Sequence, residues 1–499
     1  MTTRRLLISF FLLYGLIILI FAREFVAQNI SASIAMIGSS MIVAILLWSK
    51  RATFINVILA FYVFQSYLTR PFISIFEKEL SPKNLQYIEQ YSSYFSPEAC
   101  AVVYWSLFSL LFAWLMGLIL LRGPQKDSHF YPPKIFIRID QAIIKGGFPF
   151  ILAFSLLLIL NYRSIGSGLR GSITGEDTTL FLWGLASLAT ISVVCLYVFL
   201  LRRHFQLKPC RSYLVVLSLV SVLGSALSGS RSSVYVFIII GLCYWLILNI
   251  SKKWTLGSLF KASSLLFILL TIAAISALFA QALRPMYRYA ESFNASDILS
   301  VIDFQSVVLV KENILFGITQ LLHRLSALQA QFYVLNDWYV HDPLQYYNPV
   351  QAFMRIVNDL FPGDIFPGIL TINQLFNYIY FGTYIHYASE TWGIQSTLYL
   401  YFGHIGAPIV VFLLALLINH YYPVIEKALI ISPAFAAFII LFLFDFFSNG
   451  TAERVIPIDV VRPIASFIIF LFLCKVFSSV FRSLHQAVKK SKGTLTNVI

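Results

Sequence analysis

Long apolar runs without an ionisable side chain are the feature that most constrains this chain. Residues 6–22, 102–121 and 262–283 contain no Lys, Arg, Asp, Glu or His. Because an α-helix rises about 1.5 Å per residue, these runs of 17 to 22 residues are about 26–33 Å long as helices, which matches the ~30 Å of hydrocarbon that a membrane helix crosses. Only 12% of the 499 residues are charged, about half the share of a soluble domain. We therefore predict an all-α polytopic membrane protein.

About twelve transmembrane helices are predicted. They lie at residues 6–22, 30–48, 53–69, 99–121, 146–161, 179–201, 212–227, 233–250, 262–282, 393–418, 430–447 and 463–481. Arg4 and Arg5 before the first run also fit a signal peptide, but no small-residue cleavage site follows them, so we expect a retained helix. The chain then divides into helices one to nine (1–282), one large loop (283–392), helices ten to twelve (393–482) and a basic tail (483–499).

The charges of the predicted loops indicate how the helices are oriented. If both termini are cytoplasmic, the cytoplasmic segments hold 22 of the 36 basic residues and only three acids, Asp127, Asp140 and Glu426. Cytoplasmic loops carry such an excess of Lys and Arg, so the large loop is predicted on the opposite, outer side. The net charge of +14 is then a sign of topology, and no nucleic-acid partner is expected.

Arginine and lysine are divided differently between the two sides. Thirteen of sixteen lysines are predicted inside, but eleven of twenty arginines are predicted outside. Topology alone would deplete both types, whereas a need for planar donors that bind phosphate or carboxylate retains arginine. The alternative is that these arginines pair with outer acids. The set is Arg23, Arg70, Arg163, Arg170, Arg231, Arg284, Arg288, Arg324, Arg355, Arg454 and Arg462.

The large loop is rich in Tyr and Trp beside Asn, Asp and Gln. Such surfaces stack on sugar rings and bond their hydroxyls, although an aromatic belt at the membrane interface has the same composition. Residues 306–316 and 320–334 have the pattern of short amphipathic helices. Residues 358–368 form a turn-rich segment that is predicted to re-enter the membrane or to cap a cavity.

Several outer arginines are candidates for binding an anion. Arg231 lies in the small-residue turn Ser228-Gly-Ser-Arg-Ser-Ser233, just before a helix N-terminus, where free amides and the helix dipole favour negative charge. Pairing with Asp303 or Asp445 is the alternative. The further candidates from three other regions of the chain are Arg284, Arg288, Arg324, Arg454 and Arg462.

A general base is expected in the large loop. His386 and Glu390 are four residues apart and would share one face of a helix, just before the tenth span. The other candidates are Asp303, His323, His341, Asp342 and Asp359, and a structural role at the interface is the alternative for any single histidine. No group of His, Asp, Glu or Cys residues has metal-ligand spacing, so neither a metal nor a cofactor is expected.

These features resemble the bacterial O-antigen polymerase (Wzy) family. The chain shares with that family the number of spans, the Gly229-Ser-Arg231 turn before an apolar helix and a large late outer loop. The stretch Ser389-Glu-Thr-Trp-Gly-Ile-Gln-Ser-Thr-Leu-Tyr-Leu-Tyr-Phe-Gly-His-Ile-Gly406 looks like the polar run that leads into that family's glycine-rich span. Ala452-Glu-Arg454 and Arg462 are similar to its closing loop.

The resemblance implies an inverting, metal-independent glycosyltransferase of the GT-C-like class in the bacterial inner membrane. It would join undecaprenyl-pyrophosphate-linked repeat units at the periplasmic face, with a chain-length regulator as a further partner. Arg231, Arg288, Arg324 and Arg454 would hold the pyrophosphates and stabilise the leaving group. An acid or histidine of the large loop would activate the acceptor hydroxyl, with Glu390 as the first candidate and His386 as the second. The alternatives are an O-antigen ligase that transfers glycan to lipid A–core, and a flippase or another transporter of lipid-linked oligosaccharide.

Overall fold

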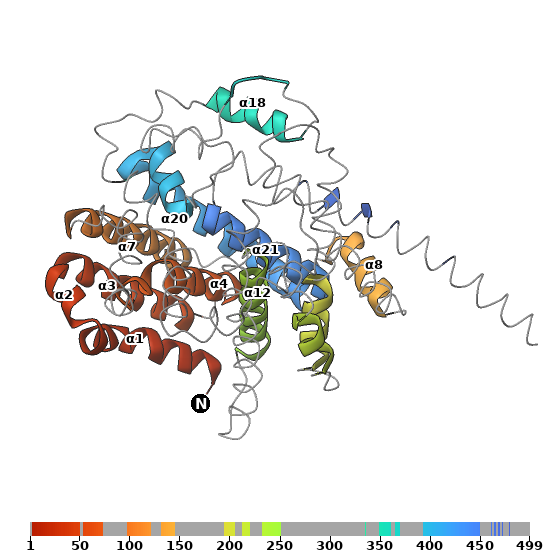
Figure 1. Cartoon of the computed structure of the whole chain (residues 1–499), viewed down its shortest axis with the longest axis horizontal. Helices are drawn as coiled ribbons and strands as arrows, with labels where there is room; N and C mark the ends of the chain where they lie inside the picture. The colour runs from red at the N-terminus through yellow and green to blue at the C-terminus, as the bar shows by residue number, and fades with distance from the viewer. Residues whose placement is uncertain are drawn as a thin grey trace, which may run out of the picture.

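The computed structural model shows a bundle of helices in the part of the chain that it describes (Figure 1). The described residues are 2–49, 53–72, 97–120, 131–144, 194–204, 212–219, 232–250, 349–360, 365–369 and 393–449, with residues 335, 461, 464, 465, 468, 469, 472 and 479. The elements are α1 (Thr3–Phe21), α2 (Arg23–Gln28), α3 (Ile30–Trp48), α4 (Thr53–Val63), the π-helix η1 (Phe64–Leu68), α7 (Pro97–Leu120), α8 (Lys134–Ala142), α12 (Ser232–Asn249), α18 (Pro349–Leu360), α20 (Gly393–Ile431) and α21 (Pro433–Asn449).

Four helices are long and apolar enough to cross a membrane, which makes this an α-helical membrane protein. They are α1, α3, α7 and residues Gly393–Tyr422 of α20, and α21 adds a shorter apolar helix, Pro433–Phe444. Each of these coincides with a predicted span. The reason is that a segment in hydrocarbon must satisfy all of its backbone hydrogen bonds internally, so a long apolar run can only be a helix. The predicted spans 146–161 and 262–282 lie outside the described residues, and the total of twelve remains a prediction.

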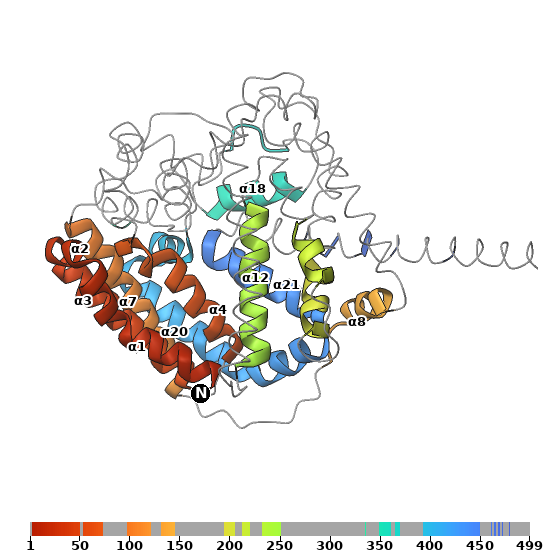
Figure 2. The same cartoon turned by 60° about the horizontal axis from the view of Figure 1, so that its bottom comes forward.

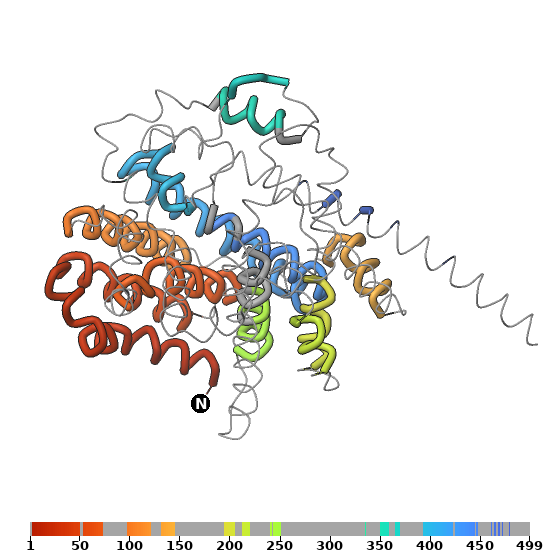
Figure 3. The backbone as a smooth tube through the Cα atoms, in the orientation of Figure 1, coloured from red at the N-terminus to blue at the C-terminus, as the bar shows by residue number. Residues whose placement is uncertain are grey.

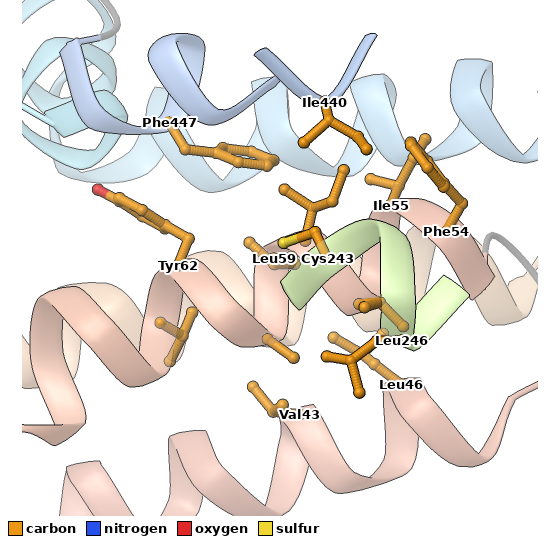
Figure 4. Packing of buried hydrophobic residues seen from close by; sticks show 14 of the residues in the cluster. Val43, Leu46, Phe54, Ile55, Leu59, Tyr62, Cys243, Leu246, Ile440 and Phe447 are labelled. Carbon is orange, nitrogen blue, oxygen red and sulfur yellow. The ribbon is translucent and has the colours of Figure 1, made fainter. Parts of the chain in front are cut away.

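The helices pack in succession, as the tube in Figure 3 allows the reader to follow. α1 packs on α3, α3 on α7, α7 on α20, and α20 on α21. A second set of contacts joins α4 and α12 to α21. Figure 4 shows this cluster, in which Tyr62 of α4 stacks on Phe447 of α21 with ring centroids 5.5 Å apart. Cys243 and Leu246 of α12 lie in the same buried cluster.

A glycine allows α7 and α20 to approach each other closely. A Cβ atom placed on Gly117 of α7 would lie 2.6 Å from the Cβ of Ala415 and 2.7 Å from the carbonyl oxygen of Phe412, both in α20. Atoms cannot approach that closely, so only glycine fits there. Small residues hold membrane helices together in this way, because lipid offers no hydrophobic driving force for association.

Hydrogen bonds bring several helix ends together at one end of the bundle. The Arg4 amide donates to the Ile250 carbonyl at 3.1 Å, and its guanidinium donates to Thr53 Oγ1 at 3.0 Å. The Phe54 amide donates to the Tyr422 hydroxyl oxygen at 3.0 Å. The start of α1, the end of α12, the start of α4 and residue 422 of α20 thus share one end, as the predicted topology requires. We call this end the base of the bundle and the opposite end its top.

The turn between α20 and α21 is held by two charged side chains from other helices. Asp140 of α8 accepts hydrogen bonds from Ser432 Oγ and, at 3.1 Å, from the Ala434 amide, so it caps the start of α21. Arg202 donates to the Ile431 carbonyl at 3.0 Å and so caps the end of α20. An anion at a helix N-terminus and a cation at a C-terminus are both favoured by the helix dipoles. The predicted cytoplasmic face therefore has a defined structure at this turn.

Residues 419–429, between the predicted tenth and eleventh spans, are helical in the structure. α20 continues to Ile431, and Ser432 alone separates it from α21. Because Glu426 and Lys427 are charged, they mark the end of the apolar span, but charge does not stop a helix. Pro433 cannot continue α20, so a new helix begins there, and Asp140 and Arg202 cap the two helix ends at this turn.

Candidate functional site

All of the residues that the sequence placed in the site lie outside the described residues. They are Arg231, Arg284, Arg288, Arg324, Arg454, Arg462, His386 and Glu390. Their roles therefore remain predictions. Three of the eleven outer arginines, Arg23, Arg70 and Arg355, are described, and together with α20 they show how the top of the bundle is built.

The end of α4 at the top of the bundle is irregular. After Val63 the helix widens into the π-helix η1, which is rare and often lies at functional sites. Helix ends leave carbonyl groups without hydrogen-bond donors, and here two tyrosine hydroxyls act as the donors. Tyr14 of α1 donates to the Leu68 carbonyl at 2.8 Å, and Tyr104 of α7 donates to the Tyr67 carbonyl at 3.0 Å. The last turn is thereby fixed between α1 and α7.

Arg70 follows this turn and is buried, with 8% of its surface exposed. Its guanidinium is close enough to influence Cys100 and Tyr104 of α7 electrostatically. A cation just beyond a helix C-terminus is favoured by the helix dipole. Arginine is nevertheless rarely buried without a specific task, because its charge must be neutralised or hydrogen-bonded. Of the three described outer arginines, Arg70 is the most buried, whereas Arg23 on α2 is exposed.

The other side of α7 carries the first turns of α20, which are polar. Gln395 is 1% exposed, and its amide donates to the Val103 carbonyl at 2.9 Å and to Ser106 Oγ. Tyr399 donates to the Ser106 carbonyl at 3.0 Å. Ser396 is fully buried beside Gln395. Polar groups within a membrane span are expensive to bury, so they usually belong to a functional region.

Gly403 divides α20 into two helices. Its φ of 68° and ψ of −176° lie in a region that only glycine adopts without strain. Pro408, one turn later, has no amide hydrogen to bond to the His404 carbonyl, so the second helix starts with weakened pairing. Ile405 beside the break is 81% exposed. Broken membrane helices commonly line binding sites, because unpaired backbone groups are tolerated only where they meet protein, water or a ligand.

The top of α7, from about residue 98 to 109, is therefore flanked by two polar features. On one side lie η1 and the Arg70 guanidinium, and on the other the polar first part of α20. A guanidinium binds phosphate oxygens, whereas an amide and hydroxyls suit sugar hydroxyl groups. In the part of the chain that the structure describes, no three His, Cys, Asp or Glu residues gather as a metal site would need.

Sequence reasoning included Arg70 among the outer arginines but did not single it out. Residues 393–406 were predicted to belong to a polar stretch, but no role was assigned to Gln395. The useful signal was the run Gln395-Ser-Thr397 at the start of an otherwise apolar span. Comparison with protein-family models, with curated proteins and with solved structures finds no match to this chain in any of the three.

Proposed function

We propose that this protein is a GT-C-like polymerase with twelve spans that joins lipid-linked oligosaccharide repeat units at the outer face of a bacterial inner membrane. The observation that carries the proposal is the retention of eleven of twenty arginines on the side from which lysine is almost absent. A polyprenyl pyrophosphate needs planar, permanently charged donors at the membrane surface, because the pyrophosphate is an anion before transfer and leaves as one. The buried Arg70 at the top of the bundle supports this reading.

The reaction assigns the arginines and the loop to separate tasks. Arg231, Arg284, Arg288, Arg324, Arg454 and Arg462 hold the two pyrophosphates, and Arg324 also stabilises the charge that develops on the leaving group. Glu390, or else His386, takes the proton from the acceptor hydroxyl as that oxygen attacks the anomeric carbon of the donor glycan. The new glycosidic bond forms opposite the breaking bond to the pyrophosphate oxygen, which inverts the anomeric centre. The first part of α20 supplies neutral donors and acceptors for sugar hydroxyls.

Deletion of the gene, followed by gel analysis of surface and lipid-linked glycan, tests the proposal. A polymerase is indicated if the deletion strain carries glycan of one repeat unit. Polymer that remains on the lipid carrier would indicate a ligase instead, and a lack of any glycan on the outer side would indicate a flippase. Either of these two results contradicts the proposal.

Complementation with arginine variants tests the site. Arg231→Lys and Arg324→Lys keep the charge but lose the planar fork, and we expect each to lower chain growth by roughly 100-fold. Arg23→Lys is a matched control, because Arg23 is exposed at the top of the bundle and should retain full chain growth. Immunoblots of membranes must show equal amounts of all three. Normal chain growth in the Arg231 and Arg324 variants contradicts the site assignment.

A further inference from the structure

The helix α18 in the large loop has its polar and apolar sides reversed relative to a helix of a soluble protein. On a helical wheel Gln351, Arg355 and Asn358 lie on one side, and Val350 and Phe353 lie on the opposite side. Such a helix normally turns its apolar side toward the protein and its polar side toward water. In α18 the polar side faces the protein.

The inward contacts are made by polar groups. Asn358 is 9% exposed, and its amide nitrogen donates to the Phe366 carbonyl at 2.8 Å while its amide oxygen accepts from the Phe366 amide at 2.9 Å. Arg355 reaches the Ile369 carbonyl at 3.5 Å. These bonds fold residues 365–369 back against α18. The turn-rich segment predicted at 358–368 thus closes on α18.

The outward side of this unit is apolar and exposed. Val350 is 58% exposed and Phe353 is 63% exposed. A cluster of large exposed apolar groups on a soluble surface is unfavourable and marks a contact with a partner or a membrane. No described residue on this outward side is charged, since Arg355 is turned inward.

The position of α18 indicates what covers this side. In Figures 1 and 2 α18 lies beyond the end of the bundle at which α12 begins, which is the top. Both views also show that it runs across the direction of α12. If the apolar helices of the bundle cross a membrane, the bilayer surface lies at the top of the bundle. α18, which lies beyond that end and runs across the bundle, is then roughly parallel to the membrane plane. This is the orientation of a helix that lies in the interface of a bilayer.

We propose that α18 docks on the outer leaflet of the membrane, with Val350 and Phe353 inserted at the level of the lipid headgroups. The occupant is the lipid surface, because an uncharged apolar side on a helix parallel to the membrane fits the headgroup–acyl boundary. Docking at this level holds the large loop against the membrane surface. The inference requires that the protein crosses a membrane, and it does not depend on the proposed reaction.

Site-directed fluorescence in lipid bilayers tests the docking. Phe353→Cys and, separately, Val350→Cys are introduced into a full-length variant without its five native cysteines, labelled with an environment-sensitive dye and reconstituted into vesicles of phosphatidylethanolamine and phosphatidylglycerol. Quenching by lipids with a nitroxide at the headgroup is compared with quenching by aqueous iodide. We expect iodide quenching to fall about threefold or more between detergent and bilayer, and headgroup-level nitroxides to quench strongly. Gln351→Cys lies between the two labelled positions but on the polar side of α18. It is the matched control, and its iodide quenching should change little between detergent and bilayer.

Two results would overturn the proposal. Iodide quenching at Phe353 that is equally strong in detergent and in vesicles shows that the face meets water. A second contrary result is that Phe353 is protected from iodide both in detergent and in vesicles and is not quenched by the lipid nitroxides. This result shows that protein covers the face, either another part of the chain or another molecule. As an independent readout, Phe353→Asp should make the loop more sensitive to protease in vesicles, whereas Gln351→Asp should not. Because Phe353 is exposed, Phe353→Asp is expected to fold.

Discussion

The two parts of α20 on either side of Gly403 are built differently, although they belong to one continuous apolar stretch. The part after Gly403 packs through small residues, with Ala415 against Gly117 of α7, and ends under the caps from Arg202 and Asp140. The part before Gly403 is joined to α7 by hydrogen bonds, chiefly those of Gln395. The second part is thus held to α7 by close packing with one longer hydrogen bond, from Asn419 to the Leu118 carbonyl at 3.4 Å, and the first mainly by polar pairing.

Under the proposed function, this difference separates anchoring from substrate contact within one helix. Packing through small residues is tight and offers no chemistry, so the second part of α20 serves as a scaffold. Buried polar groups stabilise a membrane helix less, but they offer donors and acceptors to a ligand. The break at Gly403 allows the two parts to take different directions. Four substitutions test this division, and they are given in order of their expected effect.

Gly117→Leu should have the largest effect, because it acts on the packed part of α20. Its side chain would overlap Ala415 and the Phe412 carbonyl, and backbone cannot move aside easily. We expect a loss of about 3 kcal/mol or more in the free energy of unfolding. Unfolding in mixed micelles of mild detergent and dodecyl sulfate measures this. Ile45→Leu on the exposed side of α3 is the control, and equal stability of the two variants would contradict the close packing.

Gly403→Ala tests whether the break is required. Nothing lies within 4 Å of the added Cβ, so any effect comes from the backbone alone. At φ 68° and ψ −176° an alanine is strained by about 2 kcal/mol, and the same unfolding measurement should show that loss. Under the proposed function, chain growth should also fall, because α20 would tend to straighten. A variant with unchanged stability would show that the chain does not hold this conformation.

Substitutions of Asp140 test whether the caps at the turn after α20 stabilise the fold. Asp140→Ala leaves the Ser432 hydroxyl and the Ala434 amide without their acceptor, and we expect a loss of about 1–2 kcal/mol near pH 7.5. Asp140→Asn keeps an acceptor and is the matched control, with stability close to that of the unchanged protein. A loss as large in Asp140→Asn as in Asp140→Ala would show that the charge, and not the hydrogen bonding, holds the turn.

The pH dependence of stability gives a second test of the same carboxyl group. Burial raises the pKa of Asp140 from 3.8 to about 6, while its hydrogen bonds to Ser432 and Ala434 and the charge of Arg202 partly oppose this rise. The folded protein therefore takes up a proton at a higher pH than the unfolded chain does. Binding of this proton stabilises the folded state relative to the unfolded chain. The stabilisation is fully present below about pH 4 and is lost as the pH rises through 6. Melting temperatures between pH 5 and 7.5 should show the trend, which Asp140→Asn should lack.

Gln395→Leu should have the smallest effect on stability, because it acts on the polar part of α20. The substitution removes two hydrogen bonds, but the Val103 carbonyl still accepts from Ser106 Oγ at 2.8 Å. We expect a change of less than about 1 kcal/mol. Under the proposed function, chain growth should nevertheless fall while the protein remains folded. Full chain growth in this variant would limit the polar part of α20 to a structural role.

The sequence predicted the positions of the membrane helices well. α1, α3 and α7 begin and end within three residues of the predicted spans 6–22, 30–48 and 99–121. The π-helix η1 and the break at Gly403 were not predicted. Both depend on hydrogen bonds to other helices or on backbone angles, and neither leaves a periodic pattern in the sequence. The predicted site residues, from Arg231 to Arg462, lie outside the described part of the chain, so their arrangement remains a prediction.

The sequence by itself determined that this chain forms membrane helices and where the four described spans lie, because hydrocarbon leaves a long apolar segment no alternative to a helix. It also predicts the unequal division of Arg and Lys between the two sides on which the proposed function depends. The tertiary structure decided that Arg70 is buried and that α18 turns its apolar side outward. It also decided that α20 runs to Ile431, where Asp140 and Arg202 cap the turn. These features depend on which side chains meet across the bundle, and the pattern of any one segment does not contain that information.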